Sequence, residues 1–320
     1  MIFILTEAGG TSGFGHLTRC LSLYDECVSR GFETKLVINS FSQLPESIGK
    51  RSVELFNWLD LTYLRGLLSA DDFAIVDSYL APYEVYEFIS GICKKVVFID
   101  DYMRISYPES IVVCPALYGD KLPYPEIPGV CYCGGSGYII LRSEFLEPAE
   151  NPVCHKPPGS EPTRIIITMG GTDIFGLTAP VLAAISKQFP DSQKSVILGS
   201  NHFDKKAVEK AADKNTEILV SLDAKQMRDI MIRADFAITT AGQTIHELLR
   251  YGIPMIPILV ADNQRLNIQG LGNLGFSFIN ALDEIFDPSA FDWKSLVTGT
   301  PRLPEMNFEG HKNVVNLLLC

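Results

Sequence analysis

The sequence has no run of basic residues, no apolar stretch of membrane-spanning length and no second cysteine pair at metal-site spacing. Its 27 Lys and Arg are outnumbered by 38 Asp and Glu, which gives a formal net charge of −11. Such a chain is a poor partner for nucleic acid or for anionic membrane surfaces. A spanning helix needs ~20 apolar residues, and the apolar start of the chain lacks the basic flank of a signal peptide. We therefore expect a cytoplasmic protein with no integral membrane segment.

The eight cysteines argue against a disulfide framework and against a metal centre. Cys20 and Cys27 fall on the apolar face of an expected helix, where a cytosolic chain keeps thiols reduced. Cys131 and Cys133 form a lone C-x-C pair. We interpret the cysteines as small hydrophobic residues and expect neither a metal nor a cofactor.

Length and composition favour two globular domains, since the chain has 320 residues of which 47% are hydrophobic. The stretch 146–162, "LEPAENPVCHKPPGSEP", carries five prolines and little apolar content. It predicts a linker between an N-terminal domain at 1–146 and a C-terminal domain at 163–320. The sequence leaves open whether the last helix packs back on the N-terminal domain.

Both halves alternate short apolar runs with helical patterns. Continuous apolar runs are typical of parallel strands that are covered on both faces, and Gly31 is the natural C′ residue of the first helix. Prolines in the last strand favour an edge position or a bend. The expected strands are 2–6, 34–38, 73–77, 95–100, 164–168, 195–198, 217–220, 236–239 and 253–259. The expected helices are 15–30, 60–69, 82–91, 176–189 and 312–319. The pattern predicts an α/β fold of two Rossmann-like domains, with ligands at the carboxyl ends of the strands.

The segment "TMGGTDIFGLT" (168–178) places a glycine turn between an expected strand and an expected helix. Gly170 and Gly171 let the backbone approach a ligand closely, and Thr172 completes the turn. Amide groups at the start of the following helix favour an anion such as pyrophosphate. The alternative is an ordinary turn in which Thr or Asp caps the helix.

The segment "TTAGQTIHELLRYGIP" repeats this arrangement. In the functional interpretation, Gly242, Gln243 and Thr244 bind phosphates and Glu247 binds ribose hydroxyls. The alternative is structural, because Thr244 followed by Glu247 three residues later has the spacing of a capping box.

A third polar cluster, Asp262, Asn263 and Gln264, follows the next apolar strand. It faces the same sheet edge as the two glycine turns if the strands are parallel. The alternative is a helix cap formed by Asp262 or Asn263.

These segments together resemble the nucleotide-binding domain of GT-B enzymes, in particular the UDP-sugar hydrolases of the pseudaminic-acid pathway and the spore-coat polysaccharide proteins. In the first half, "GFGHLTRCLSL" is similar to that family's G-x-G-H-x-x-R-C-L-x-L segment. "VDSY", "IDDYMR" and "YIILRSEF" follow in the family's order. The resemblance spans about residues 12 to 315 and implies two Rossmann-like domains that face each other across a cleft. "LTEAGGTS", "CPALYGD" and "FEGHKNVV" depart from the family pattern, which leaves the sugar unidentified.

The resemblance makes His16 the catalytic candidate. It sits where the first turn becomes the first helix, and the positive end of a helix disfavours an imidazolium. A neutral imidazole is what a general base needs. Gly13 and Gly15 would leave room for sugar and water beside it. The alternative is a histidine that only caps or packs the helix.

The remaining roles come from the resemblance. Tyr79 would hydrogen-bond His16 or the attacking water, or else line the cleft. Asn263, between Asp262 and Gln264, would position the sugar or water.

Three charged residues keep two interpretations each. Arg19 would reach a substrate oxygen, or form a surface ion pair of little energetic value. Asp100 and Asp101 would form a glycosidase pair, or else one cap and one solvated charge.

The resemblance implies hydrolysis of a UDP-linked amino- or deoxysugar at the anomeric carbon, for surface glycan or nonulosonic acid synthesis. A glycosyltransferase, a UDP-GlcNAc 2-epimerase-like enzyme and a non-catalytic sugar-nucleotide-binding protein remain as alternatives. We expect a monomer or weak homo-oligomer.

Overall fold

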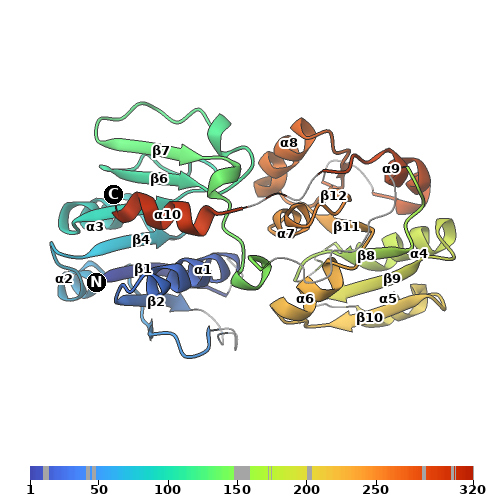
Figure 1. The fold of residues 1–320 in the computed structure, drawn as a ribbon, viewed down its shortest axis with the longest axis horizontal. Helices are drawn as coiled ribbons and strands as arrows, with labels where there is room; N and C mark the ends of the chain where they lie inside the picture. Colours follow the sequence, from blue (N-terminus) through green and yellow to red (C-terminus); the bar gives the residue numbers. More distant parts are fainter. Residues whose placement is uncertain are drawn as a thin grey trace. The chain divides into compact units, whose positions relative to one another are not determined.

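The computed structural model divides the chain into two compact units, Met1–Ser143 with Phe308–Cys320 and Glu144–Asn307 (Figure 1). The structure describes residues 1–9, 14–40, 44, 48–147, 159–171, 173, 175–199, 204–282, 286–303, 306 and 308–319. Each unit contains a parallel sheet flanked by helices.

The described residues of the first unit form a seven-stranded parallel sheet in the order β3-β2-β1-β4-β5-β6-β7. Its strands are β1 (Ile2–Ala8), β2 (Thr34–Ser40), β3 (Val53–Leu55), β4 (Phe73–Asp77), β5 (Lys95–Ile99), β6 (Ser110–Cys114) and β7 (Val130–Gly134). Its helices are α1 (Gly15–Ser29), α2 (Leu61–Leu67), α3 (Tyr83–Ile92) and α10 (Gly310–Leu319).

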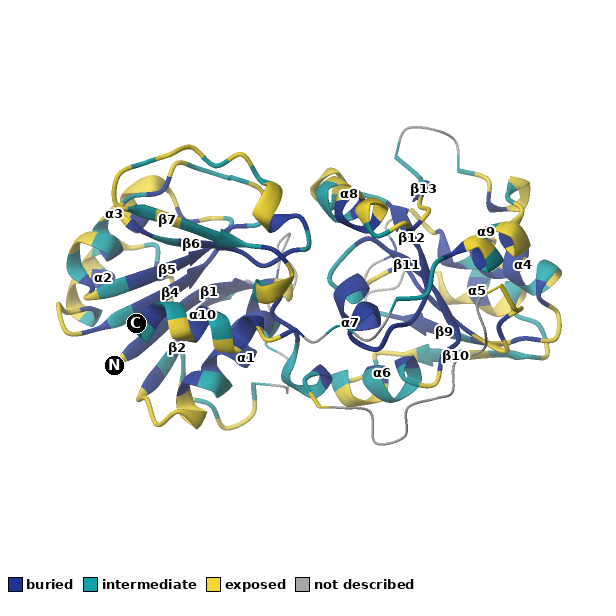
Figure 2. Cartoon of the chain, turned by 45° about the horizontal axis from the view of Figure 1, so that its top comes forward, coloured by how far each residue is buried: buried dark blue, intermediate teal, exposed yellow. Residues whose placement is uncertain are grey.

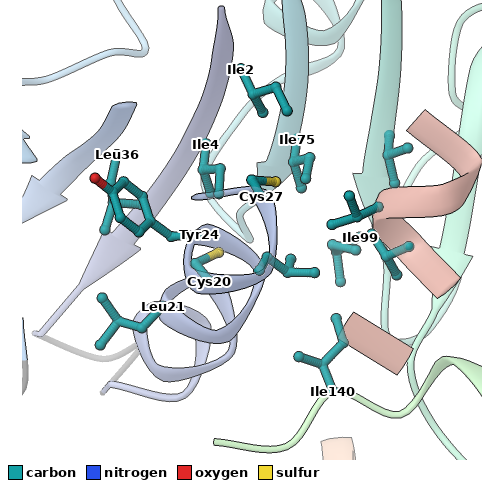
Figure 3. Close-up of a cluster of buried hydrophobic side chains, with 14 of the residues drawn as sticks. Ile2, Ile4, Cys20, Leu21, Tyr24, Cys27, Leu36, Ile75, Ile99 and Ile140 are labelled. Atoms are coloured by element: carbon teal, nitrogen blue, oxygen red, sulfur yellow. The ribbon is translucent and has the colours of Figure 1, made fainter. Parts of the chain in front are cut away.

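Alternate residues of each central strand build the two faces of this sheet. Ile2 and Ile4 of β1 pack with α1 and α10, whereas Phe3 and Leu5 pack with α2 and α3. Figure 3 shows the first cluster, where the apolar side of α1 faces the strands. This double coverage explains why the strands read as continuous apolar runs.

Helix α1 is closed by the glycine that the sequence predicted. Gly31 has a φ of +83°. Its amide donates to the Val28 carbonyl at 2.9 Å, and the Phe32 amide donates to the Cys27 carbonyl at 3.1 Å. This pair of bonds is a Schellman motif, which requires the left-handed φ that glycine adopts without strain.

The described residues of the second unit form a six-stranded parallel sheet in the order β10-β9-β8-β11-β12-β13. Its strands are β8 (Arg164–Thr168), β9 (Gln193–Leu198), β10 (Thr216–Val220), β11 (Phe236–Thr240), β12 (Met255–Leu259) and β13 (Ile279–Asn280). Its helices are α4 (Thr178–Gln188), α5 (Lys205–Ala211), α6 (Ala224–Met231), α7 (Thr244–Arg250), α8 (Arg265–Asn273) and α9 (Trp293–Gly299). In Figure 2 the central strands of both sheets are buried, whereas exposed residues lie on the outer sides of the helices.

The predicted α/β fold with two Rossmann-like domains is therefore confirmed. The unit boundaries differ from the expected ranges 1–146 and 163–320. Residues 308–320 belong to the first unit because α10 packs against α1 in its core, and residues 144–147 belong to the second. Most of the expected linker lies outside the described residues.

Of the two interpretations of the prolines in the last strand, an edge position or a bend, the edge position was wrong. β12 pairs with β11 on one side and with β13 on the other. Its proline is tolerated because β13 pairs only with Ile258 and Leu259, so Pro257 has no ladder partner on that side.

Candidate functional site

His16 lies in the first turn of α1, and its side chain is buried. The helix starts at Gly15, where an added Cβ would meet no heavy atom within 4 Å. Phe14 takes the N-cap position without a side-chain cap bond. Gly13 lies outside the described residues. The turn-to-helix position expected for His16 is therefore the position that the structure gives it.

Asp77, the last residue of β4, orients the imidazole. His16 Nδ1 lies 2.6 Å from Asp77 Oδ1, and the Asp77 side chain is fully buried. A carboxylate only accepts hydrogen bonds, so the contact assigns the proton to Nδ1. The other ring nitrogen, Nε2, is then an acceptor and able to take a proton. An Asp that fixes a histidine tautomer in this way is the arrangement of hydrolytic triads.

Arg19, one turn further along α1, joins two carboxylates. Its Nε donates to Asp77 Oδ2 at 2.5 Å, and its Nη2 donates to Asp77 Oδ1 at 2.6 Å. Its Nη1 and Nη2 donate to the two oxygens of Asp101 at 2.8 and 2.9 Å. The guanidinium is buried, so its ion pairs are not the surface pair that the sequence offered as the alternative; the contact with a substrate oxygen stays a prediction.

This network keeps Asp77 ionised. Burial acts to raise the pKa of Asp77, but the charge of Arg19 and the hydrogen bonds from Arg19 and His16 outweigh it and hold the pKa well below the usual carboxyl range. The same balance of burial and Arg19 lowers the pKa of Asp101. Both carboxylates are therefore acceptors near neutral pH.

Tyr79 completes the cluster but does not hydrogen-bond His16. Its hydroxyl donates to Asp101 Oδ2 at 2.5 Å, and its ring meets the imidazole edge-on with centroids 4.2 Å apart. Its backbone amide donates to Glu7 Oε1 at 2.8 Å, and Ser78 Oγ also donates to this buried glutamate of β1. Burial, then the charge of Asp101, raises the pKa of the Tyr79 phenol, which stays neutral.

Asp100 and Asp101 bind different partners in the structure. Asp100 accepts the backbone amides of Tyr102 and Arg104 at 3.3 and 3.2 Å, and the Tyr124 hydroxyl at 2.9 Å. Asp100 thus caps a turn, as the structural alternative expected. Asp101 is not a solvated charge, because Arg19 and Tyr79 bind it.

The sequence reasoning left Asp77 without a role, and it gave Asp101 only the two interpretations shared with Asp100. A signal was present, because each follows or ends an apolar strand. β1, β4 and β5 are neighbours in the parallel sheet, so their carboxyl ends meet at one edge.

In the second unit, the three predicted segments follow β8, β11 and β12, which are also neighbours in a parallel sheet. Gly170 has a φ of +80°, and a Cβ on it would lie 3.6 Å from Thr240 Oγ1. A Cβ on Gly199 would lie 2.1 Å from the Gly171 carbonyl oxygen, so the turn after β8 packs closely on the end of β9. Thr172 lies outside the described residues.

The start of α4 is already occupied by a side chain. Asp173 accepts the amides of Leu177 and Thr178 at 2.8 and 2.9 Å. This is the Asp cap of the structural alternative. The backbone of the Gly170–Gly171 turn, rather than these two helix amides, is left to approach an anion.

The expected capping box at α7 was wrong. Thr244 is the first helical residue, and Gln243 takes the N-cap position without a side-chain cap bond. The side chain of Gln243 instead contacts His246 Nδ1 through Oε1 at 3.1 Å. Glu247 is buried on the same helix. Gly242 lies in the turn before α7, where an added Cβ would meet no heavy atom within 4 Å.

Asp262 and Asn263 do not cap α8. They belong to a short 3₁₀ helix over Asp262–Gln264, and Gln264 is the N-cap residue of α8. Asp262 Oδ1 accepts Arg265 Nε at 2.8 Å, and Gln264 Oε1 accepts the Val260 amide at 3.1 Å. Asn263 is exposed at this end of the sheet.

Two further properties bear on ligands. Across the described ranges, no three His, Cys, Asp or Glu side chains are grouped closely enough to hold a metal ion. The helices in the described part of the chain are too short or too polar to cross a membrane.

Proteins of known structure share the fold of this chain. MurG of Acinetobacter baumannii aligns with a TM-score of 0.64 at 14% identity, covering 99% of both chains. The UDP-GlcNAc 2-epimerase of Neisseria meningitidis, solved with UDP-GlcNAc, aligns with a TM-score of 0.62 at 11% identity, covering 100% of both. At these identities the likeness shows the fold, which is the two-domain α/β fold of the GT-B class.

Curated relatives are distant, and no family model matches the chain. An uncharacterized protein of Methanocaldococcus jannaschii is 27% identical over 277 residues, covering 82% of this chain and 56% of that protein. Pseudaminic acid cytidylyltransferase and UDP-2,4-diacetamido-2,4,6-trideoxy-beta-L-altropyranose hydrolase of Helicobacter pylori is 23% identical, covering 85% and 47%. Spore coat polysaccharide biosynthesis protein SpsG of Bacillus subtilis is 23% identical, covering 67% and 63%. The chain spans about half the length of the first two relatives.

Proposed function

We propose that this protein is a nucleotide-sugar hydrolase that releases UDP from a UDP-linked amino- or deoxysugar, with His16 as the general base. The observation that carries the proposal is the buried contact between His16 Nδ1 and Asp77, which leaves Nε2 as the acceptor. The names of the Helicobacter pylori and Bacillus subtilis relatives support the substrate class.

The proposed reaction is a single displacement by water. Nε2 of His16 removes a proton from water while the water oxygen attacks the anomeric carbon. The bond between that carbon and the UDP oxygen breaks. The electron pair leaves with UDP. Asp77 stabilises the imidazolium that forms, and Arg19 keeps Asp77 ionised for this role.

The second unit would hold the nucleotide. We assign the pyrophosphate to the backbone of the Gly170–Thr172 and Gly242–Thr244 turns, and the ribose hydroxyls to Glu247. Backbone donors at these turns would stabilise the charge that develops on the leaving group. Asn263, exposed after β12, would position the sugar or the water, with Asp262 and Gln264 beside it.

A glycosyltransferase is the second candidate, because several structural neighbours carry that name. His16 would then deprotonate an acceptor hydroxyl instead of water. The geometry of His16 and Asp77 serves either nucleophile.

Isotope labelling separates the two candidates. Incubation of a UDP-sugar panel in ¹⁸O-water without an acceptor should release UDP to completion, with the label in the sugar. NMR should first detect the inverted anomer, since one direct displacement inverts the configuration. UDP release that requires an added acceptor would move the protein to the transferases, and label in UDP would mean attack at phosphorus.

A glycine substitution tests the nucleotide site. Gly171→Val should weaken UDP binding roughly tenfold or more, ~1.4 kcal/mol, because the added side chain would project where the phosphates approach. The fold should survive, since a Cβ on Gly171 meets no heavy atom within 4 Å and Gly171, unlike Gly170, has no left-handed φ. Calorimetry with UDP gives the affinity.

Gly272→Val is the matched control, because Gly272 lies near the end of α8 and its Cβ position is equally open. It should keep wild-type UDP affinity. Equal affinities for both variants and the wild type would remove the turn after β8 from the nucleotide site.

A further inference from the structure

We propose that Asp101 is a positioning residue for this reaction, because its paired contact with Arg19 holds a guanidinium that would otherwise disturb the tautomer of His16. The inference rests on the proposed role of His16 as base. Asp101 does not contact His16 itself, so it acts through its neighbours.

Both the side chain and the backbone of Asp101 accept hydrogen bonds that hold the residue in place. Its two carboxylate oxygens accept Arg19 Nη1 and Nη2, and Oδ2 also accepts the Tyr79 hydroxyl. Its backbone carbonyl accepts the Tyr118 hydroxyl at 2.8 Å. A carboxylate that faces both outer nitrogens of a guanidinium forms the bidentate pair, which is strong and directional.

The Nη2 group of Arg19 is the link to the imidazole. It carries two protons, and the contacts assign one to Asp77 Oδ1 at 2.6 Å and one to Asp101 Oδ2 at 2.9 Å. The same nitrogen lies only 3.2 Å from His16 Nδ1. The Nη2–H bonds have fixed directions in the guanidinium plane, so loss of the Asp101 contact does not by itself redirect a proton. It leaves Arg19 bound to Asp77 alone, and the guanidinium can then turn an N–H group toward Nδ1.

The consequence is chemical. Nδ1 can accept a hydrogen bond only when it carries no hydrogen itself. In a neutral imidazole the single ring proton is then on Nε2. A His16 protonated on Nε2 has lost the acceptor that the proposed base needs. By holding the guanidinium of Arg19 in place through Nη1 and Nη2, Asp101 favours the Nδ1–H form that donates to Asp77.

Asp101 also fixes the polarity of the Tyr79 hydroxyl. The single phenol proton is donated to Asp101. The Tyr79 oxygen can therefore only accept hydrogen bonds from other groups. Because the pKa of the phenol is also raised by burial and by Asp101, Tyr79 would orient a water or a sugar hydroxyl without exchanging a proton with it.

The test compares two neighbouring carboxylates. D101N removes the charge of Asp101 and replaces one of its two acceptor oxygens at Arg19 by an amide donor, whereas D100N alters a residue that caps a turn and bonds Tyr124. ¹⁵N chemical shifts of the His16 ring in the free protein report the tautomer, and H16N assigns the signal. We expect the Nδ1–H form in the wild type and D100N, and a rise of the Nε2–H form in D101N.

The kinetic arm uses the same variants. UDP release by D101N should be ~10²-fold slower in kcat, a loss typical of a misplaced catalytic group, and D100N should match the wild type. Asp101 is 18% exposed, so water can bind the freed guanidinium and D101N should fold. Asp101→Ala, which leaves room for that water, gives the same readout if D101N does not fold.

The outcomes separate the two proposals. A wild-type tautomer in both Asp101 variants would overturn the positioning role, whatever the activity. Absence of UDP release by the wild type from every donor would overturn the proposed function, while the tautomer measurement would still decide the role of Asp101.

Discussion

Replacing His16 with Asn is expected to lower kcat for UDP release by ~10²- to 10⁴-fold, the range of a lost general base. The substitution is selective because the Asn amide nitrogen can take the place of Nδ1 and still donate to Asp77. Only the Nε2 end of the ring is lost. Steady-state kinetics with the best donor of the panel would measure the loss.

UDP affinity is the internal control for H16N. The segments assigned to the nucleotide belong to the second unit, and His16 belongs to the first. Calorimetry should therefore give a UDP affinity close to that of the wild type. Turnover that stays at the wild-type rate would exclude His16 as the base.

The expected effect of Asp77→Asn is as large, at ~10³- to 10⁴-fold in kcat, the scale of an Asp-to-Asn change in a catalytic triad. Arg19 Nε donates to Asp77 Oδ2 and Arg19 Nη2 donates to Oδ1, so the Asn carbonyl oxygen would keep the Nε bond and the Nη2 bond would be lost. The Asn amide group would then face His16 and donate to Nδ1. This exchange puts the ring proton on Nε2 and removes the base without removing the histidine.

The ¹⁵N shifts of His16 should report the Nε2–H form in D77N, alongside the kinetic loss. A D77N enzyme with full activity would contradict the assigned tautomer. Loss of activity with the Nδ1–H form retained would mean that Asp77 acts in another way.

Asp77 also gives the stability of the protein a defined pH dependence. Its folded pKa lies below the ordinary value, so it stabilises the fold fully above the unfolded carboxyl pKa of ~3.9. That contribution is lost as the pH falls toward the folded value. Urea unfolding between about pH 5 and 3 should therefore show a shallower acid loss in D77N than in the wild type.

Asp100 supplies a control of opposite sign. Burial raises its folded pKa, so the folded state binds its proton more readily than the unfolded state. D100N should thus steepen the acid loss rather than flatten it. If the unfolding free energy of D77N, D100N and the wild type fell with pH at the same slope, neither carboxylate would have a perturbed pKa.

Several features were readable from the sequence because they depend on local chemistry. The apolar runs that became β1 and β8 are continuous because both faces of each sheet are covered. Gly31 ends α1 because its backbone needs a left-handed φ. His16 could be placed at the start of a helix because its glycine turn and the apolar stripe are close together in the chain.

The partners of His16 could not be read in this way. Asp77 lies 61 residues from His16, and Asp101 lies 82 residues from Arg19. They meet because β1, β4 and β5 are neighbours in the sheet, an order that no local pattern encodes. The identity of the α4 cap and the absence of a box at Thr244 also depended on where each helix begins. Sequence by itself determined the central strands, the helix that begins at the candidate base and that base. It did not predict β3, β6, β7, β13, α5, α6 and α9. Tertiary structure decided which carboxylates surround that base, because strand order alone brings distant chain segments to one sheet edge.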